Sequence, residues 1–360
     1  MTNRRKFLQG IAALSSFSLA SCSWQLGNVR SATNSGSSDQ LHLYTWTQYV
    51  DQELLQTFTT QTGIKTLADV YDSNEVMLAK LLAGGGGVYS LIYPSDYMVQ
   101  KMEEQGLLIE LNHERLQGIE QLFSQFQNPS YDPKNRHSIP FSWGTTGLIY
   151  NSAILKDAPE DWDYLWQNQG ILNKRMTLLN DVREVMGAVL RMLGYSYNSK
   201  DESQIKQAYE KLLELKPAIA SFDTDAWQNQ MLAGDLILAM CYSVDAIKVN
   251  RENPQLKYII PRSGSSLWTD TIVIPKTAPN IDGAYDWLNF MLKPEVAAMI
   301  SQRMNLATPN RIGFEKLPNQ IKNNQNLFPP NSLLERCERI TPLGDLEDVY
   351  ERYWTQLTSN

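Results

Sequence analysis

The stretch Leu41-His-Leu-Tyr-Thr-Trp46, together with the segment 51–62 and Gly63 that follow it, sets the pattern that decides the fold. The first stretch is short and largely apolar, which predicts a buried β-strand. In the second, Leu54 and Phe58 recur at helical spacing, and Gly63 is a typical helix end. A strand followed by an amphipathic helix is the repeating unit of α/β proteins.

Later segments repeat this pattern along the chain. Strands are expected at 88–93, 176–179, 236–242, 256–260 and 271–274. Helices are expected at 96–105, 182–193 and 201–215, and two more within 284–304, separated near Pro294. This alternation predicts α/β layers with mostly parallel sheets.

The composition is that of a soluble globular protein with room for two domains. The chain has 360 residues, 42% of them hydrophobic, and a formal net charge of −7. This charge favours a cationic partner over DNA, RNA or an anionic lipid surface. His42, His113 and His137 lack the spacing of metal ligands, so we expect no metal site.

Residues 1–21 read as an export signal, with the twin arginines Arg4 and Arg5 before a short apolar run. Cys22 follows a lipobox-like Leu-Ala-Ser, which predicts lipidation at Cys22; the alternative is an ordinary signal peptide cut nearby. Residues 22–40 then read as a flexible polar tether. No later segment reaches transmembrane length. The expected product is an exported protein anchored to a membrane by lipid.

Cys241 and Cys337 remain if Cys22 is acylated. An oxidising compartment would allow them to form a disulfide. Two separate buried thiols are an equally good reading, and the sequence leaves both open.

Aromatic rings and carboxylates gather at the predicted strand ends, where ligand sites of α/β sheets lie. An ammonium group that leaves water needs a carboxylate or several acceptors, and aromatic faces add cation–π attraction of about 0.5–2 kcal/mol each. The pattern therefore suits a ligand with amines separated by methylenes. The candidate ligand-binding residues are Trp46, Thr47, Tyr49, Ser95, Tyr97, Asp181, Glu184, Tyr242, Asp245, Trp268 and Asp270.

Several of these residues also have structural explanations. Asp181 and Glu184 have the spacing of a helix capping box, the aromatic rings can be core or hinge packing, and the neighbouring Asp96 can cap the next helix. Asp270 is harder to explain as packing, because a carboxylate at a strand start is seldom core filler.

Collinear motifs resemble the periplasmic spermidine/putrescine-binding proteins of ABC transporters. They run from about residue 40 to the C-terminal Tyr-Glu-Arg-Tyr, and no single one is decisive. They are Tyr44-Thr-Trp-Thr-Gln-Tyr-Val50, Thr62-Gly-Ile-Lys65, Ser73-Asn-Glu75, Pro94-Ser-Asp-Tyr97, Asp132-Pro133, Ser138-Ile-Pro-Phe-Ser-Trp-Gly144, Asp181-Val-Arg-Glu184, Leu193-Gly-Tyr-Ser196, Trp268-Thr-Asp270 and Thr308-Pro-Asn310.

The resemblance implies a two-lobed periplasmic-binding-protein fold, type II-like, with a ligand cleft between the lobes. Lobe one would comprise residues 41–145 and 271–313, and lobe two residues 146–270 and 314–360. The protein would be a periplasmic, monomeric receptor that uses no cofactor, performs no catalysis, and delivers putrescine or spermidine to ABC permease subunits.

The resemblance also assigns roles within the cleft. Trp46, Thr47 and Tyr49 match one pocket segment of the first lobe, and Ser95 and Tyr97 match another. Asp181 and Glu184 match acids that hold amino groups. Trp268 and Asp270 match a ring and carboxylate pair, in which Asp270 would be the central ammonium partner.

The chain departs from the family pattern in four places. Tyr242 stands where the family often has Trp, Leu306 where it often has Tyr, and a family Gln has no counterpart near Ile340. Asp245 adds a carboxylate. The alternatives are therefore another organic amine, a sensor role, or an exported hydrolase using Asp181 and Asp270 as acid and base. No nucleophile motif supports the hydrolase.

Overall fold

The structure is a computed structural model that describes residues 40–71 and 73–359. The expected signal peptide 1–21, the lipidation site Cys22 and nearly all of the expected tether lie outside these residues. In the part described, no helix combines the length and hydropathy needed to cross a membrane.

The strands combine into one mixed sheet. Their bounds are β1 (Gln40–Trp46), β2 (Lys65–Tyr71), β3 (Leu91–Ile92), β4 (Ser138–Asn151), β5 (Met176–Leu178), β6 (Ile219–Phe222), β7 (Leu238–Tyr242), β8 (Leu256–Ile259) and β9 (Leu267–Val273). They are ordered β2-β1-β3-β9-β4-β7-β5-β6, and β8 also pairs with β4.

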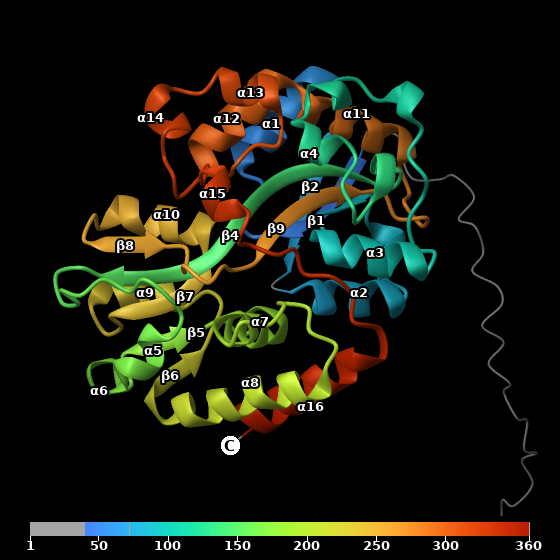
Figure 1. Cartoon of the computed structure of the whole chain (residues 1–360). Helices are drawn as coiled ribbons and strands as arrows, with labels where there is room; N and C mark the ends of the chain where they lie inside the picture. Colours follow the sequence, from blue (N-terminus) through green and yellow to red (C-terminus); the bar gives the residue numbers. More distant parts are fainter. Residues whose placement is uncertain (1–39, 72, 360) are drawn as a thin grey trace, which may run out of the picture. The chain divides into compact units, whose positions relative to one another are not determined.

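Helices cover this sheet (Figure 1). The α-helices are α1 (Gln52–Thr62), α2 (Asn74–Leu82), α3 (Asp96–Glu104), α4 (Ser124–Gln127), α5 (Tyr164–Gln167), α6 (Gln169–Leu172), α7 (Val182–Met192), α8 (Glu202–Leu215), α9 (Trp227–Ala233), α10 (Ser243–Glu252), α11 (Ile281–Leu292), α12 (Pro294–Met304), α13 (Arg311–Glu315), α14 (Asn319–Lys322), α15 (Asn331–Leu334) and α16 (Glu347–Thr358). Short 3₁₀ turns are η1 (Gly85–Val88), η2 (His113–Arg115), η3 (Ile119–Gln121), η4 (Pro133–Asn135), η5 (Lys216–Ala218) and η6 (Gly344–Leu346).

The first strand and helix form where the sequence predicts them. β1 buries Leu41 and Leu43 completely between β2 and β3. The Asp51 side chain accepts a hydrogen bond of 2.8 Å from the Leu54 amide and so caps α1. Gly63 ends the helix with φ of 77°, a left-handed conformation that suits glycine.

The expectation of mostly parallel sheets is wrong. β1 is parallel to β2 and β3, and β5 is parallel to β6 and β7, but β9 is antiparallel to β3 and to β4. The sequence analysis missed β4, a strand of 14 residues that is buried throughout. From Ser138 to Thr145 it pairs with β9, and from Thr146 to Asn151 with β7 and β8. β4 therefore connects the two halves of the sheet, β2-β1-β3-β9 and β7-β5-β6.

Two predicted strands have different ends in the structure. The expected strand 88–93 is reduced to Leu91 and Ile92, because the glycine-rich segment before it forms η1. The expected strand at 271–274 begins earlier, at Leu267, because β4 offers pairing partners that far back. Trp268 and Asp270 therefore lie within a strand and not before it. The break between α11 and α12 at Pro294 is as predicted.

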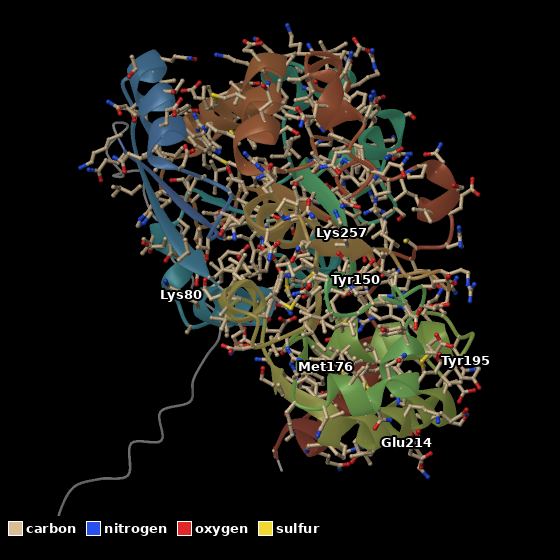
Figure 2. The ribbon with its side chains drawn as sticks, turned by 90° about the vertical axis from the view of Figure 1, so that its left-hand side faces the viewer. Lys80, Tyr150, Met176, Tyr195, Glu214 and Lys257 are labelled. Carbon is tan, nitrogen blue, oxygen red and sulfur yellow. The ribbon has the colours of Figure 1, made fainter. Side chains whose placement is uncertain are left out.

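Separate cores involve the two halves of β4. One contains Leu43, Phe58 and Trp287 and is covered by α1, α11 and α12. Another contains Leu190 and Tyr350 and is covered by α7, α8 and α16. Figure 1 shows these helix groups at opposite ends of the described structure. In Figure 2, Met176 belongs to the second core, while the exposed Glu214 projects from α8.

Cys241 and Cys337 are free thiols, and Cys241 is fully buried. His113 and His137 contact backbone carbonyl oxygens at 2.9 and 2.8 Å. Within the described ranges, no group of three or more His, Cys, Asp or Glu side chains could hold a metal ion.

Candidate functional site

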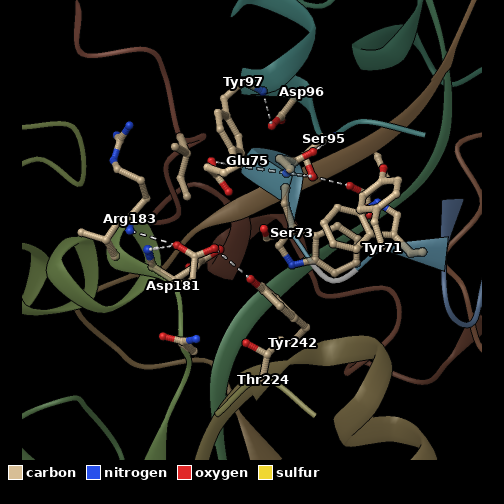
Figure 3. Close-up of a pocket in the computed structure, with 18 of the residues that line it drawn as sticks. Tyr71, Ser73, Glu75, Ser95, Asp96, Tyr97, Asp181, Arg183, Thr224 and Tyr242 are labelled. Atoms are coloured by element: carbon tan, nitrogen blue, oxygen red, sulfur yellow. Dashed lines mark hydrogen bonds between the residues drawn. The ribbon is translucent and has the colours of Figure 1, made fainter. Parts of the chain in front are cut away.

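Every candidate ligand-binding residue lines one cavity of about 370 Å³. Figure 3 shows part of this lining. Trp46, Thr47, Tyr49, Ser95, Tyr97, Asp181, Glu184, Tyr242, Asp245, Trp268 and Asp270 all line it. They come from the ends of β1, β3 and β7, from the start of α7, and from β9, which belong to different parts of the sheet order. The structure thus brings these residues together around one cavity, and their role in ligand binding stays a prediction.

Aromatic rings form much of the cavity wall. The Trp46 indole donates a hydrogen bond of 2.8 Å to the Tyr93 carbonyl oxygen and lies 4.6 Å, centroid to centroid, from the Tyr71 ring. Tyr242 meets Trp268 edge to face at 6.1 Å. These contacts fix the orientation of the rings before a ligand arrives, so their faces are ready to cover methylene groups or an ammonium ion.

Asp270 is a buried anionic group, 5% exposed in the middle of β9. Its Oδ1 accepts a hydrogen bond of 2.6 Å from Ser95 Oγ, and its Oδ2 accepts one from the Tyr49 hydroxyl. Burial raises the pKa of Asp270 to about 7, although both hydrogen bonds oppose the rise. Among the residues that the structure describes, Asp270 has hydroxyl partners and no cationic partner.

Asp181 combines the structural and the functional reading. Its Oδ1 caps α7 by accepting hydrogen bonds from the Arg183 and Glu184 amides at 2.9 and 3.0 Å. Its Oδ2 accepts a longer bond of 3.3 Å from the Tyr242 hydroxyl within the cavity. One oxygen therefore stabilises the helix while the other faces the ligand space, as Figure 3 shows.

The Glu184 carboxylate turns toward neighbours inside the protein. It accepts hydrogen bonds from Ser266 Oγ at 2.7 Å and from the Tyr197 hydroxyl at 3.0 Å. Burial first, and then the charge of Asp181, raise the pKa of Glu184 to about 8. The capping box is thus only half formed, since Asp181 caps the helix and Glu184 does not reach back.

Asp245 forms a further anionic group at the start of α10. It is 8% exposed and accepts hydrogen bonds from Gln48 Nε2 at 3.1 Å and from Gln228 Nε2 at 3.3 Å. Burial, followed by repulsion from Asp225, raises the pKa of Asp245 to about 7. The charge of Lys248 and the two amide donors oppose this rise only in part, so a ligand cation can still improve the surroundings of Asp245.

Asp96 differs from the expectation that it caps a helix. Ser95 occupies the N-cap position of α3, and Asp96 is the first helical residue. Its buried carboxylate forms an ion pair with Arg339 at 2.7 Å. The same guanidinium donates to Thr269 Oγ1 at 2.6 Å. Arg339 thus supplies the cation for Asp96, which lines the cavity but is already paired.

The sequence analysis missed other residues that line the cavity. Glu75 lies in the Ser-Asn-Glu motif quoted for the family, so a signal for it was present. For α16 the signal was the C-terminal Tyr-Glu-Arg-Tyr motif of the family resemblance, which lies within this helix. The missed lining residues include Tyr71, Asn74, Glu75, Lys101, Arg183, Ile340, Glu347, Tyr350, Glu351 and Trp354. Leu306, by contrast, is buried in the first core.

The sequence model of one family, described as bacterial extracellular solute-binding protein, matches residues 53–329. The chain belongs to this family. The chain is similar to a spermidine/putrescine-binding periplasmic protein of Salmonella typhimurium, with 34% identity over 328 residues that cover 91% of this chain and 94% of that protein. The putrescine-binding periplasmic protein SpuD of Pseudomonas aeruginosa is 29% identical and covers 92% and 95%.

Solved structures agree with this family membership. This solute-binding protein superimposes on a putative spermidine/putrescine ABC transporter protein of Listeria monocytogenes with a TM-score of 0.84 and 36% identity, covering 89% of this chain and 98% of that one. The Tp0655 lipoprotein of Treponema pallidum gives 0.80 and 27%, covering 89% and 100%. The two-lobed periplasmic-binding-protein fold expected from the sequence is confirmed.

Proposed function

We propose that this solute-binding protein captures a polyamine, putrescine or spermidine, and delivers it to an ABC permease. The observation that carries the proposal is Asp270, a buried carboxylate that has hydroxyl partners but no cation and that stands among aromatic rings. A ligand ammonium would supply the missing charge, and Trp268 and Tyr242 would cover the adjoining methylenes. The names of the relatives support the same ligand class.

The other buried carboxylates support a ligand with more than one ammonium group. Asp181 directs its Oδ2 toward the cavity, where it accepts one long hydrogen bond from Tyr242, and Asp245 lies at the start of a different helix. Charges spread along a chain of methylenes could reach separate carboxylates, whereas a single ammonium could not. Such a ligand would stabilise the closed form, because it would contact both lobes only in that form.

Isothermal titration calorimetry with putrescine and spermidine tests this function. Asp270→Asn should weaken binding at least about 30-fold, because losing one partner of a buried charge pair costs about 2 kcal/mol or more. Asp235→Asn, which changes an exposed acid outside the cavity, is the matched control and should bind like the wild type. Binding of neither amine, with turnover of a glycan or ester instead, would favour the hydrolase alternative.

The departures at Tyr242 and Ile340, both of which line the cavity, bear on the alternative of another organic amine. A ring smaller than Trp and a side chain without hydrogen-bonding groups change the shape and polarity of the wall. Titration with a panel of mono- and diamines would separate this alternative from polyamine transport. Tighter binding of another amine than of putrescine and spermidine would favour it.

We infer that the lobes comprise residues 41–145 with 271–313, and 146–270 with 314–360. Within the last of these ranges, Leu327 and Phe328 pack against the core that contains Trp287. The change of partner of β4 between Thr145 and Thr146 supports the first boundary. We also propose a monomer that performs no catalysis and is anchored in the periplasm through lipidated Cys22. Mass spectrometry of the membrane fraction tests the anchor: a lipid mass on an N-terminal Cys22 is expected, and an unmodified chain would refute it.

A further inference from the structure

Acidic side chains from separate elements face one another at the rim of the cavity. Glu75 lies at the start of α2, and its Oε1 accepts a hydrogen bond of 2.9 Å from the Tyr97 hydroxyl. Asp181 lies before α7, and Glu347 and Glu351 lie on α16. Figure 3 shows the Glu75 and Asp181 carboxylates directed into the same space.

These acids stand on elements that pack into different cores. α2 contributes Met77 and Leu78 to a core that it shares with α3. α7 and α16 contribute to the core that contains Leu190 and Tyr350. Relative movement of the lobes would therefore change the separation between Glu75 and the acids on α7 and α16, without changing the neighbours within either core.

The charges at the rim are mostly of one sign. Desolvation raises the pKa of Glu75, and the negative charge of Asp181 raises it further. The pKa of Glu351 is raised by desolvation, then by Asp181 and by Glu347. The ammonium of Lys101, on α3, forms an ion pair of 2.8 Å with Glu347 and is a favourable contact across the rim. Repulsion between Glu75 and the opposite acids opposes it.

We propose that Glu75 makes closure of the cleft depend on a cationic ligand. Without a ligand, closure brings Glu75 against Asp181, whose carboxylate faces the same space, and their repulsion favours the open form. A ligand ammonium between them turns that repulsion into attraction on both sides. A neutral solute of the same size cannot do so, and the permease then meets a closed receptor only when a cation is inside. The proposal rests on the proposed function and extends it to regulation of the same site.

Single-molecule energy transfer on the full chain, without ligand, tests this mechanism. Dyes at exposed Thr60 on α1 and Gln207 on α8 report the separation of the two cores, with Cys22 and Cys337 replaced by Ser in every variant. Glu75→Gln should raise the ratio of closed to open molecules about two- to fivefold, the range of a partly exposed charge pair. Glu104→Gln, an exposed acid on α3 that does not line the cavity, should leave the ratio unchanged.

Two further arms carry the opposite signs. Lys101→Met removes the attractive charge and should lower the closed fraction, whereas 1 M NaCl should raise it in the wild type and leave Glu75→Gln less affected. An unchanged ratio in Glu75→Gln, or a closed fraction that rises in Lys101→Met, would overturn the mechanism. Calorimetry with putrescine and spermidine is run in parallel. Absence of binding there refutes the polyamine function, while the ligand-free populations judge the gating by Glu75.

Discussion

Binding of an ammonium group beside Asp270 should release a proton, because the carboxyl group must be charged to attract the ligand. Burial places the pKa of this group at about 7 in the ligand-free protein. A bound cation favours the charged form and lowers the pKa again. Ligand ammonium groups, with pKa values near 10 like lysine, stay charged throughout the range of interest. The affinity should therefore rise with pH up to the pKa of the free protein.

The size of the effect follows from the charged fraction of Asp270. With a pKa of about 7, about half of the molecules carry the charge at pH 7, about one in ten at pH 6 and about one in a hundred at pH 5. Since only the charged form binds the ammonium group, the apparent dissociation constant should exceed its value at high pH by about twofold at pH 7, about tenfold at pH 6 and about a hundredfold at pH 5. Asp245, which has a similar pKa, adds a second factor wherever the ligand reaches it.

Calorimetry in two buffers with different ionisation enthalpies measures the released protons directly. At pH 7 we expect about half a proton for Asp270 alone and about one if Asp245 takes part. Asp270→Asn should lose its share of this proton release as well as most of the affinity. A dissociation constant that is flat from pH 5.5 to 8.5, with no proton release, would refute the reasoning.

The remaining predictions concern stability and shape. The folded protein keeps a proton on Glu184 up to a pKa of about 8, whereas the unfolded chain loses it at the ordinary glutamate pKa, so stability should fall as pH rises between these two values. Glu184→Gln removes this loss, so the change in melting temperature that it causes should be more favourable at pH 9 than at pH 5. An equal change at both pH values would contradict the assignment. Trp268→Ala should weaken polyamine binding about tenfold or more while circular dichroism still shows a cooperative transition; a collapsed transition would indicate a core role instead. Gly144→Ala would place its Cβ 2.4 Å from Trp268 Cζ2 and 2.5 Å from Ser243 Oγ, so it should lower both the melting temperature and the affinity. Wild-type values for both would show that Trp268 and Ser243 can move to make room for the methyl group.

Local signals in the sequence predicted the elements that depend on neighbouring residues. Asp51 caps the start of α1, Gly63 ends this helix, and Pro294 begins α12, because each acts within one helical turn. β4 was missed for the opposite reason. Its partners β7, β8 and β9 lie about a hundred residues further along the chain, and its continuous burial gives no alternating pattern.

The same distinction holds for the cavity. Asp181 and Asp270 could be predicted because both lie at the ends of predicted strands or helices, where a carboxylate is seldom buried as core filler. The partners that decide their chemistry could not, since Ser95 and Tyr49 reach Asp270 from far along the chain. Likewise, the turn of Glu184 toward Tyr197 and Ser266 depends on tertiary packing that no local motif encodes.

β4 also has a consequence for how the protein can be taken apart. The first half of this uninterrupted strand pairs with β9, and its second half pairs with β7 and β8. The sheets of both lobes therefore depend on the same strand. A fragment that ends at residue 145 would leave the first half of β4 without its partner β9. In the rest of the chain, β9 would lose its partner in β4, so unpaired strand backbone would be exposed in both parts. The two lobes should melt together as one cooperative unit, and neither should survive expression on its own.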